Sequence, residues 1–358
     1  MRWFRLTSVK ICAGLLLMPL AAGLTSCKSG GTSQSVTLNG AGSTFVYPVM
    51  SRWAQAYHEG HSDVDINYQS IGSGGGVQQV RAGTVDFGAS DYPLDDKALG
   101  TMRPVLQIPE TAGPVCITYN LPQLTKPLQL SADTTAGIFL GKITSWQDPA
   151  IAKDNPGVTL PNTKIVVAHR TDGSGTTAAF TMYLSAVSQE WKSKVGQGGA
   201  VSWPVGVGGK GSEGVTATVR QSPGSIGYVE LTYAQQNKLP VASVKNLGGK
   251  YVQPSTASTT AAIAGYADQL TKDPRTPIVN PPASAADAYP ISTLTFLLIP
   301  KDGADVAKRS ALKKFVQYVI TDGQSSAGAL NYAALPDSIR QYDTAQLGQM
   351  TTNGAPAQ

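Results

Sequence analysis

The chain has 358 residues, which is long enough for two lobes that each bury a core. Its formal net charge is +5, but three basic residues and no acidic ones lie in residues 1–26, so residues 27–358 carry only +2. A net charge this small gives no support for nucleic-acid binding, and any anion must be bound by local geometry. The three cysteines require no disulfide framework.

Residues 1–26 have the order of a bacterial export signal. Three basic residues precede an apolar run from Ile11 to Leu24, which is too short to span a bilayer. The run ends in Leu24-Thr25-Ser26-Cys27, which resembles the lipobox, a motif in which the cysteine receives a lipid and becomes the mature N-terminus. We expect residues 1–26 to be removed and Cys27 to carry a lipid; an ordinary exported cysteine is the alternative.

Residues 27–35 contain this cysteine and a Gly/Ser-rich stretch that predicts a flexible tether. As a random coil the stretch would reach roughly 16 Å. Cys116 lies in an apolar run and is expected to be a buried, inert thiol. His58 and His61 stand near acidic residues, but their segment is typical of a solvated helix end, and we expect no metal there or elsewhere.

The folded part is expected to begin with a strand at Val36-Thr37-Leu38, followed by a glycine turn over residues 39–45. Ser43 or Thr44 is expected to cap the helix that comes next. The apolar face of that helix is predicted to contain Val49, Trp53, Ala56 and Tyr57.

A second strand, glycine turn and helix follow over residues 66–80. The turn is Gly72-Ser73-Gly74-Gly75-Gly76, and the helix is expected to begin near Val77. A dinucleotide-binding fingerprint is the alternative, but its third glycine is misplaced and no acidic residue ends a matching second strand.

Another short strand, residues 85–89, leads to Ser90 and Asp91. Asp91 would then lie at the carboxyl end of a strand, where open α/β sheets bind their ligands. The alternative for Asp91 is a helix cap or an Asx-turn before Pro93.

Residues 169–177 are the stretch with the most chemistry. An apolar strand over residues 165–168 precedes them, and residues 178–184 have helical spacing. Ser174 or Thr176 can cap that helix, whose free amide groups and dipole favour an anion. Arg170 adds a planar set of donors, which Asp172 can hold in place. A helix cap with a structural ion pair is the alternative; a nucleoside-triphosphate loop would need a lysine after its last glycine.

Two long apolar strands are predicted far apart in the sequence, at residues 112–119 and 291–299. Such a pair would suit a two-lobed chain in which the backbone crosses between the lobes twice. Residues 306–320 have the pattern of an amphipathic helix. The tail over residues 352–358 is expected to be disordered.

Taken together, these motifs resemble the phosphate-binding proteins of bacterial high-affinity phosphate ABC transporters. The matching segments appear in the family's order and cover nearly all of the chain after the signal. They are residues 40–45, 71–76, 85–91, 172–176, 203–206, 208–211, 224–230 and 334–338.

The resemblance implies a fold, namely an α/β periplasmic-binding-protein fold of type II, with two lobes joined by a two-strand hinge. Residues 36–119 together with 292–351 would form a discontinuous first lobe. Residues 120–291 would form the second lobe.

The resemblance also implies a phosphate site between the lobes. The first lobe would supply Ser43, Thr44, Phe45 through its backbone amide, Ser73 and Asp91. The second lobe would supply Arg170, Ser174, Gly175 and Thr176. Asp172 would orient Arg170, and His169 would lie outside the set of residues that touch the ligand. A carboxylate fits an anion site if the ligand still carries a proton to donate.

The function implied is binding of inorganic phosphate and its delivery to the membrane subunits of an ABC importer, without catalysis, cofactor, metal or nucleic acid. The protein would be an exported monomer that faces the periplasm or the cell exterior and touches the membrane only through its lipid. One alternative is a secreted phosphatase that uses Ser73, Ser174 or Thr176 as its nucleophile. Another is a binder of sulfate, molybdate or a phosphonate.

Overall fold

The structure, a computed structural model, describes residues 35–358. The predicted signal peptide, the lipid on Cys27 and the tether as far as residue 34 lie outside the described residues. Within the described part, no helix has both the length and the apolar character needed to cross a membrane.

Eight strands form the main mixed sheet, in the order β2-β1-β3-β11-β4-β8-β6-β7. These strands are β1 Val36–Gly42, β2 Val64–Ser70, β3 Phe87–Ser90, β4 Val105–Tyr119, β6 Val166–Arg170, β7 Val207–Gly209, β8 Ser225–Glu230 and β11 Ser292–Pro300. A smaller sheet contains β5 Gln129–Leu130, β9 Ser243–Lys245 and β10 Tyr251–Val252. The strands predicted from the apolar runs are therefore all present, with shifted ends.

Strand β4 belongs to both halves of the main sheet. It pairs antiparallel with β11 over Val105 to Pro114, and its last five residues, Val115 to Tyr119, pair antiparallel with β8. Strands β1, β2 and β3 run parallel on one side, and β8, β6 and β7 run parallel on the other. This is the two-lobed α/β arrangement that the sequence predicted.

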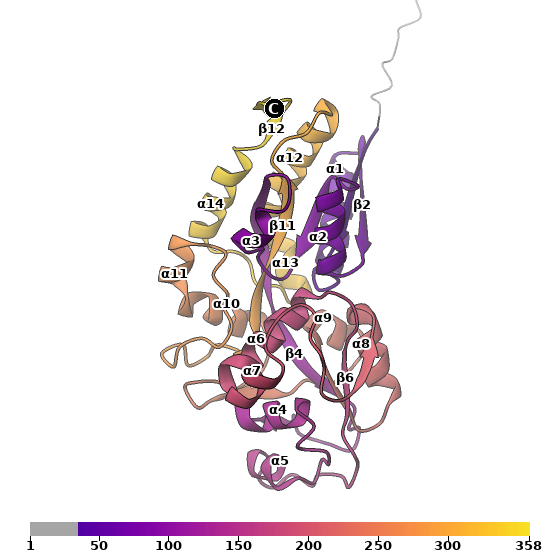
Figure 1. Ribbon diagram of the computed structural model, residues 1–358, viewed down its shortest axis with the longest axis vertical. Coiled ribbons are helices and arrows are strands. Elements are labelled where there is room, and N and C mark those ends of the chain that lie inside the picture. The colour runs from indigo at the N-terminus through magenta and orange to yellow at the C-terminus, as the bar shows by residue number, and fades with distance from the viewer. Residues whose placement is uncertain (1–34) are drawn as a thin grey trace, which may run out of the picture. The chain divides into compact units, whose positions relative to one another are not determined.

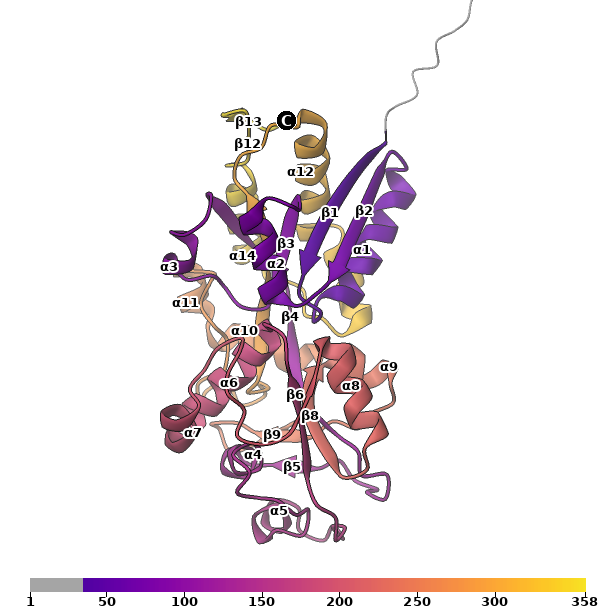
Figure 2. The same cartoon turned by 45° about the vertical axis from the view of Figure 1, so that its right-hand side comes forward.

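Helices pack on both halves of the sheet (Figures 1 and 2). Their bounds are α1 Tyr47–Gly60, α2 Ser73–Ala82, α3 Asp96–Leu99, α4 Ala132–Phe139, α5 Pro149–Asp154, α6 Gly175–Val187, α7 Gln189–Lys194, α8 Gly211–Gln221, α9 Leu231–Gln236, α10 Thr256–Gly265, α11 Ala267–Lys272, α12 Val306–Ile320, α13 Gln324–Ala327 and α14 Asp337–Leu347, with a 3₁₀ turn at Gly328–Leu330. The predicted bounds of α12 are confirmed. The helix buries Phe315, Val316 and Val319 in the core beside α1.

The prediction that Ser43 or Thr44 caps α1 is wrong. The helix begins at Tyr47, and the residue before it, Val46, makes no side-chain cap. Pro48 lies in the first turn, where its fixed φ favours a helix and its missing N–H costs no hydrogen bond. Ser43 still accepts a hydrogen bond from the Val46 amide at 3.3 Å, but it belongs to the preceding turn.

The C-terminal tail differs from the predicted disorder. Strands β12 Thr351–Thr352 and β13 Ala355–Pro356 form an antiparallel hairpin. Asn353 and Gly354 connect them with φ values of 50° and 79°, which are the left-handed conformations of a type I′ turn. The Asn-Gly pair was the sequence signal for this hairpin.

Helices α10 and α11 lie inside the predicted second lobe but pack next to the shared strands. Ile263 and Leu270 of these helices join a core cluster with Leu294 and Phe296 of β11 and with Ile339 of α14. The predicted end of the second lobe at residue 291 therefore stays a prediction, because this segment also contacts elements assigned to the first lobe.

Cys116 is a free cysteine, buried in β4 as predicted. Burial raises the pKa of its thiol well above the ordinary value, so the reactive thiolate is suppressed.

Candidate functional site

Three predicted site segments come from the half of the sheet that contains β1 and β3. Strands β1 and β3 are parallel neighbours, so the turn after Gly42 and the residue after Ser90 lie at the same edge of the sheet. The Ser43 amide donates to the carbonyl of Ala89 at 3.0 Å, which joins the two strand ends. Ser73, the first residue of α2, approaches Asp91 at the same edge, with 3.5 Å from its hydroxyl to Asp91 Oδ2.

The half of the sheet that contains β6 supplies a strand end and a helix start. Arg170 is the last residue of β6, and α6 begins at Gly175. Ser174 is the N-cap of α6, because its hydroxyl accepts a hydrogen bond from the Thr177 amide at 3.0 Å. Of the two predicted caps for this helix, Ser174 is confirmed; Thr176 lies inside the first turn.

The two sets meet directly. The Thr176 hydroxyl donates to Asp91 Oδ2 at 3.1 Å, and the Gly175 amide donates to the Ser73 hydroxyl at 3.1 Å. Further along the contact, the Gly74 amide donates to the carbonyl of Gly173 at 2.9 Å. The structure thus places the start of α2 opposite the start of α6.

Gly175 permits this approach. A Cβ atom at this position would lie 2.7 Å from the Asp91 nitrogen and 2.8 Å from the Ser73 hydroxyl. Both distances are shorter than real Cβ contacts allow, so any other residue would push the two segments apart.

The carboxylate of Asp91 lies at the junction of these turns, and the residue is 1% exposed. Burial raises its pKa to about 6, although hydrogen bonds from Ser43 and Thr176 and the charge of Arg170 favour the ionised form. Its backbone carbonyl accepts a hydrogen bond from the Thr293 hydroxyl of β11 at 2.8 Å. The side chain is therefore held toward donors, and the alternative of an Asx-turn does not describe its contacts.

Arg170 and Asp172 form a two-bond pair. Nε donates to Oδ1 at 2.8 Å and Nη2 donates to Oδ2. Burial opposes the charged form of both groups, yet the paired hydrogen bonds and charges outweigh it, so the pKa of Arg170 is raised and that of Asp172 is lowered. The Gly211 amide also donates to Asp172 Oδ1 at 2.9 Å. Arg170 therefore stays charged and fixed in direction.

Two backbone donors complete the junction. Across residues 35–358, the amide groups of Thr44 and Phe45 donate to no protein acceptor. The ring of Phe45 is fully buried and packs edge-on against Tyr332 at 6.0 Å, so only its backbone faces the junction. These amides, the helix starts and Arg170 supply positive potential, while Asp91 supplies an acceptor. This combination suits a tetrahedral oxyanion that carries a proton.

Four residues of this neighbourhood were not predicted. Ser212 joins Thr44, with 2.8 Å between the two hydroxyl oxygens and 3.1 Å from the Ser212 amide to Thr44 Oγ1. The other three are tyrosines that hold the turn over residues 43–45: Tyr68, Tyr233 and Tyr332. The glycine-rich stretch before Ser212 could have indicated this contact from the sequence, because α8 begins there. No local sequence pattern marks the three tyrosines as neighbours of the turn.

The side chain of His169 makes its contacts away from this set. Its ring stacks on Trp203 at 5.0 Å between ring centroids, and Nδ1 lies 3.1 Å from the carbonyl of Arg170. In the described part of the chain, no three His, Cys, Asp or Glu side chains are grouped to hold a metal ion.

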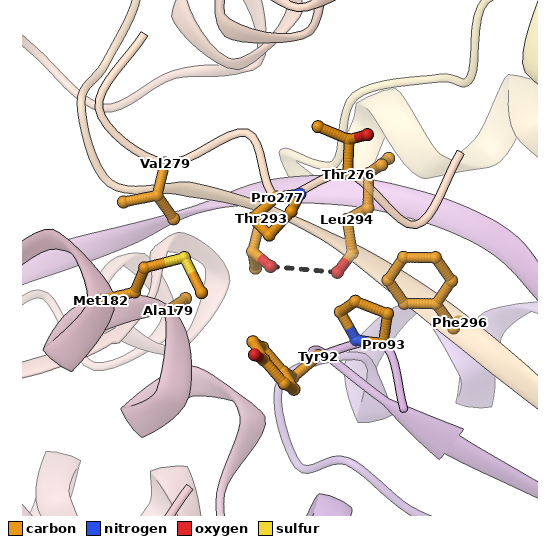
Figure 3. A pocket seen from close by; sticks show the side chains of 10 residues that line it. All are labelled: Tyr92, Pro93, Ala179, Met182, Thr276, Pro277, Val279, Thr293, Leu294 and Phe296. Carbon is orange, nitrogen blue, oxygen red and sulfur yellow. Dashed lines mark hydrogen bonds between the residues drawn. The ribbon is translucent and has the colours of Figure 1, made fainter. Parts of the chain in front are cut away.

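A small apolar cavity lies beside the junction (Figure 3). Tyr92 and Pro93, which follow Asp91, line it together with Ala179 and Met182 of α6 and Leu294 of β11. Its volume is about 10 Å³, roughly the space that one water molecule needs. The cavity is too small to be a second ligand site.

Comparisons with known proteins point in one direction. A family model described as "PBP superfamily domain" matches residues 28–323. "Phosphate-binding protein PstS" of Xylella fastidiosa strain Temecula1 is 46% identical over 319 residues, covering 89% of this chain and 86% of that protein. The protein of the same name from Pasteurella multocida is 44% identical over 316 residues, covering 88% and 91%. A solved periplasmic phosphate-binding protein (PfluDING) with bound phosphate has a TM-score of 0.67 at 23% identity, covering 87% of this chain and 93% of that one.

Proposed function

We propose that this chain, which belongs to the PBP superfamily and within it to the PstS family of phosphate-binding proteins, binds inorganic phosphate and delivers it to an ABC importer. The observation that carries the proposal is the position of Asp91. A buried carboxylate among donors from both lobes is unfavourable for a fully deprotonated anion. It is favourable for phosphate, which keeps at least one proton near neutral pH and can donate it.

The proposed contacts to phosphate are of three kinds: a positive charge, hydrogen-bond donors and one hydrogen-bond acceptor. Arg170 would supply the fixed positive charge, with Asp172 holding its guanidinium in place. Hydroxyl and amide donors would come from Ser43, Thr44, Phe45, Ser73, Ser174, Gly175 and Thr176. Asp91 would accept a hydrogen bond from the protonated oxygen of phosphate. Because the donors come from both lobes, a ligand between them would stabilise the closed form.

We propose binding without catalysis. A nucleophilic hydroxyl would need an activating base or metal, and the nearest histidine, His169, is stacked on Trp203. Asp172 is occupied by Arg170. The names of the relatives describe phosphate binding and no hydrolysis.

The place of action follows from the N-terminal sequence. Residues 1–26 would direct export, and a lipid on Cys27 would hold the protein at the membrane. The monomer would face the periplasm or the cell exterior and meet the membrane subunits of the importer there. Edman sequencing and mass spectrometry of the mature protein would test the position of the N-terminus and its lipid.

Replacing Arg170 tests the proposed site. Arg170→Ala should weaken phosphate binding by roughly 2 to 4 kcal/mol, the range for removing one partner of a buried charged hydrogen bond. The loss has two parts, because the fixed charge disappears and Asp172 then repels the anion. Calorimetric titration of protein that has been unfolded, freed of ligand and refolded would measure the change.

Arg220→Ala is the matched control, since Arg220 is an exposed arginine of α8 in the same lobe. It should bind phosphate like the parent. Equal phosphate affinity in Arg170→Ala and the parent would remove Arg170 from the site.

A further inference from the structure

The turn formed by Ser43, Thr44 and Phe45 is held through its carbonyl groups. Each of the three consecutive carbonyl oxygens accepts a hydrogen bond from a different tyrosine hydroxyl. The oxygen–oxygen distances are 2.9 Å from Tyr68 to Ser43, 2.7 Å from Tyr233 to Thr44 and 2.6 Å from Tyr332 to Phe45.

Fixing these carbonyl groups also fixes amide groups. A peptide unit is planar, so the direction of one residue's C=O sets the direction of the next residue's N–H. The carbonyls of Ser43 and Thr44 therefore set the amides of Thr44 and Phe45. Neither of these two amides donates to a protein acceptor within residues 35–358.

The hydroxyl groups remain donors at any working pH. Burial raises the pKa of the Tyr68, Tyr233 and Tyr332 hydroxyl groups above the ordinary tyrosine value. Each hydroxyl therefore keeps its proton and can donate it to a carbonyl oxygen.

Tyr233 differs from the other two in its origin. Tyr68 is on β2 and Tyr332 follows the 3₁₀ turn, both in segments assigned to the first lobe, whereas Tyr233 is on α9, which follows β8 of the second lobe. Its hydroxyl also lies 2.9 Å from Oε1 of Glu213 on α8. The single proton of the Tyr233 hydroxyl is thus shared between the Thr44 carbonyl and the carboxylate of Glu213, which lies in the same lobe as Tyr233.

Thr44 is contacted by the second lobe at two points. Its carbonyl meets Tyr233, and its hydroxyl oxygen accepts a hydrogen bond from the Ser212 amide at 3.1 Å. Figure 2 shows the carboxyl ends of β1 and β2 facing α8 and α9, from which these contacts come. Approach of the second lobe therefore acts on the backbone of Thr44, as well as on the ligand.

We infer that Tyr68, Tyr233 and Tyr332 form a tyrosine clamp that holds the turn over residues 43–45, in which Tyr68 and Tyr233 aim the Thr44 and Phe45 amides at the ligand, and that Tyr233 couples lobe closure to this aim. The inference rests on the proposed function, since it assumes that the ligand is phosphate bound at this turn. Tyr68 and Tyr332 prepare the turn, and Tyr233 completes its fixation when the lobes are together. Tyr233 is thereby a positioning residue.

Tyr233→Phe removes one hydroxyl and keeps the ring. Loss of one buried hydrogen bond in the bound form predicts that phosphate dissociates about 5- to 30-fold faster. The association rate should stay within about twofold of the parent, because the contact forms only after the lobes approach. Stopped-flow measurement of both rates, with inorganic phosphate as the probe, separates these effects.

Tyr183→Phe is the matched control. Tyr183 is a buried tyrosine of the same lobe, on α6, and its hydroxyl has no hydrogen-bond partner among the described residues. This variant should have the rates of the parent. Tyr68→Phe tests the first-lobe part of the clamp and should also weaken phosphate binding.

Three results would separate the possibilities. A parent protein that binds no phosphate contradicts the proposed function itself. A parent that binds, with an unchanged dissociation rate in Tyr233→Phe, overturns the clamp. Faster dissociation that accompanies an equal loss of stability in the ligand-free protein also overturns it, because Tyr233 would then support the fold in general. The bond to Glu213 lies within one lobe and is lost with or without ligand, so the clamp predicts a loss of phosphate binding that exceeds the loss of ligand-free stability.

Discussion

At the scale of single residues, two buried aspartates show how neighbours decide the state of a carboxylate. Asp91 and Asp343 are 1% and 0% exposed, and burial raises the pKa of both. Hydroxyl groups and Arg170 limit the rise for Asp91 to about 6. Asp343 on α14 has no hydrogen-bond partner among the described residues, and its pKa rises to about 9. Asp91 can therefore be ionised near neutral pH, while Asp343 stays neutral there.

Asp343 makes the stability of the protein depend on pH. Its pKa is raised in the folded state, so its contribution to stability is fully present below about pH 4 and is lost as the pH rises toward 9. Asp343→Asn removes this dependence. The free energy of unfolding of the variant relative to the parent should increase by up to about 1.4 kcal/mol per pH unit in this range.

Thermal unfolding from pH 4 to 9 would measure the effect. Asp322→Asn, at an exposed position, should keep a constant difference from the parent. A difference between Asp343→Asn and the parent that does not change with pH would contradict a neutral, buried Asp343.

Residues with a local signal could be predicted, and residues with only distant partners could not. The Ser174 cap and the Arg170–Asp172 pair are set by neighbours within three residues, and both are present. The tyrosine clamp depends on contacts with sequence separations of 25 to 287 residues. No spacing rule connects a tyrosine to a carbonyl that far away.

At the scale of elements, the proposed site depends on helix starts that approach closely. The start of α2 faces the start of α6, and Gly175 has no room for a side chain there. The N-terminus of α2, at Ser73, and the first turn of α6 both face the junction. Each is the positive end of a helix dipole. The approach of these helices thus concentrates donors where an anion would lie.

Gly175→Ala should disturb phosphate binding more than folding. A methyl group here would meet Asp91 and Ser73 at less than 3 Å, and the cost of such overpacking is about 1 to 3 kcal/mol. That cost applies when the lobes are together, so phosphate affinity should fall by a similar amount while the ligand-free Tm changes little. Calorimetry and thermal unfolding together would show this.

Gly60→Ala is the control, because a Cβ atom there would meet nothing within 4 Å. It should leave phosphate affinity unchanged. If Gly175→Ala binds phosphate as tightly as the parent, the close approach of α2 and α6 is not required for binding.

Elements with a strong period or a clear cap were predicted well. Helix α12 has the bounds that its apolar period indicated. The start of α1 was misplaced because proline in the first turn outweighed the nearby hydroxyl residues. The predicted disorder of the C-terminal tail was wrong because the Asn353-Gly354 turn favours a hairpin more strongly than the polar composition of the tail favours disorder.

At the scale of the whole molecule, strands β4 and β11 connect the two halves of the sheet, and the proposed ligand residues come from both. The sequence motifs indicated this organisation through family resemblance. They did not indicate how residues 256–279 would pack, because that depends on apolar contacts with β11 and α14. Lobe assignments from motif order are therefore weakest where a segment carries no site residue.

The central claim is that the closed molecule recognises the proton on phosphate through Asp91. The most direct test is competitive calorimetry of phosphate and sulfate at neutral pH on the ligand-free parent and on Asp91→Asn. The parent should bind one phosphate per chain and discriminate strongly against sulfate, which has no proton to donate and would leave Asp91 unpaired, a penalty of several kcal/mol. In Asp91→Asn the amide can donate to an unprotonated oxygen, so sulfate affinity should rise far more than phosphate affinity falls. A parent that binds sulfate as well as phosphate, or a variant that rejects sulfate as strongly as the parent does, would contradict the claim.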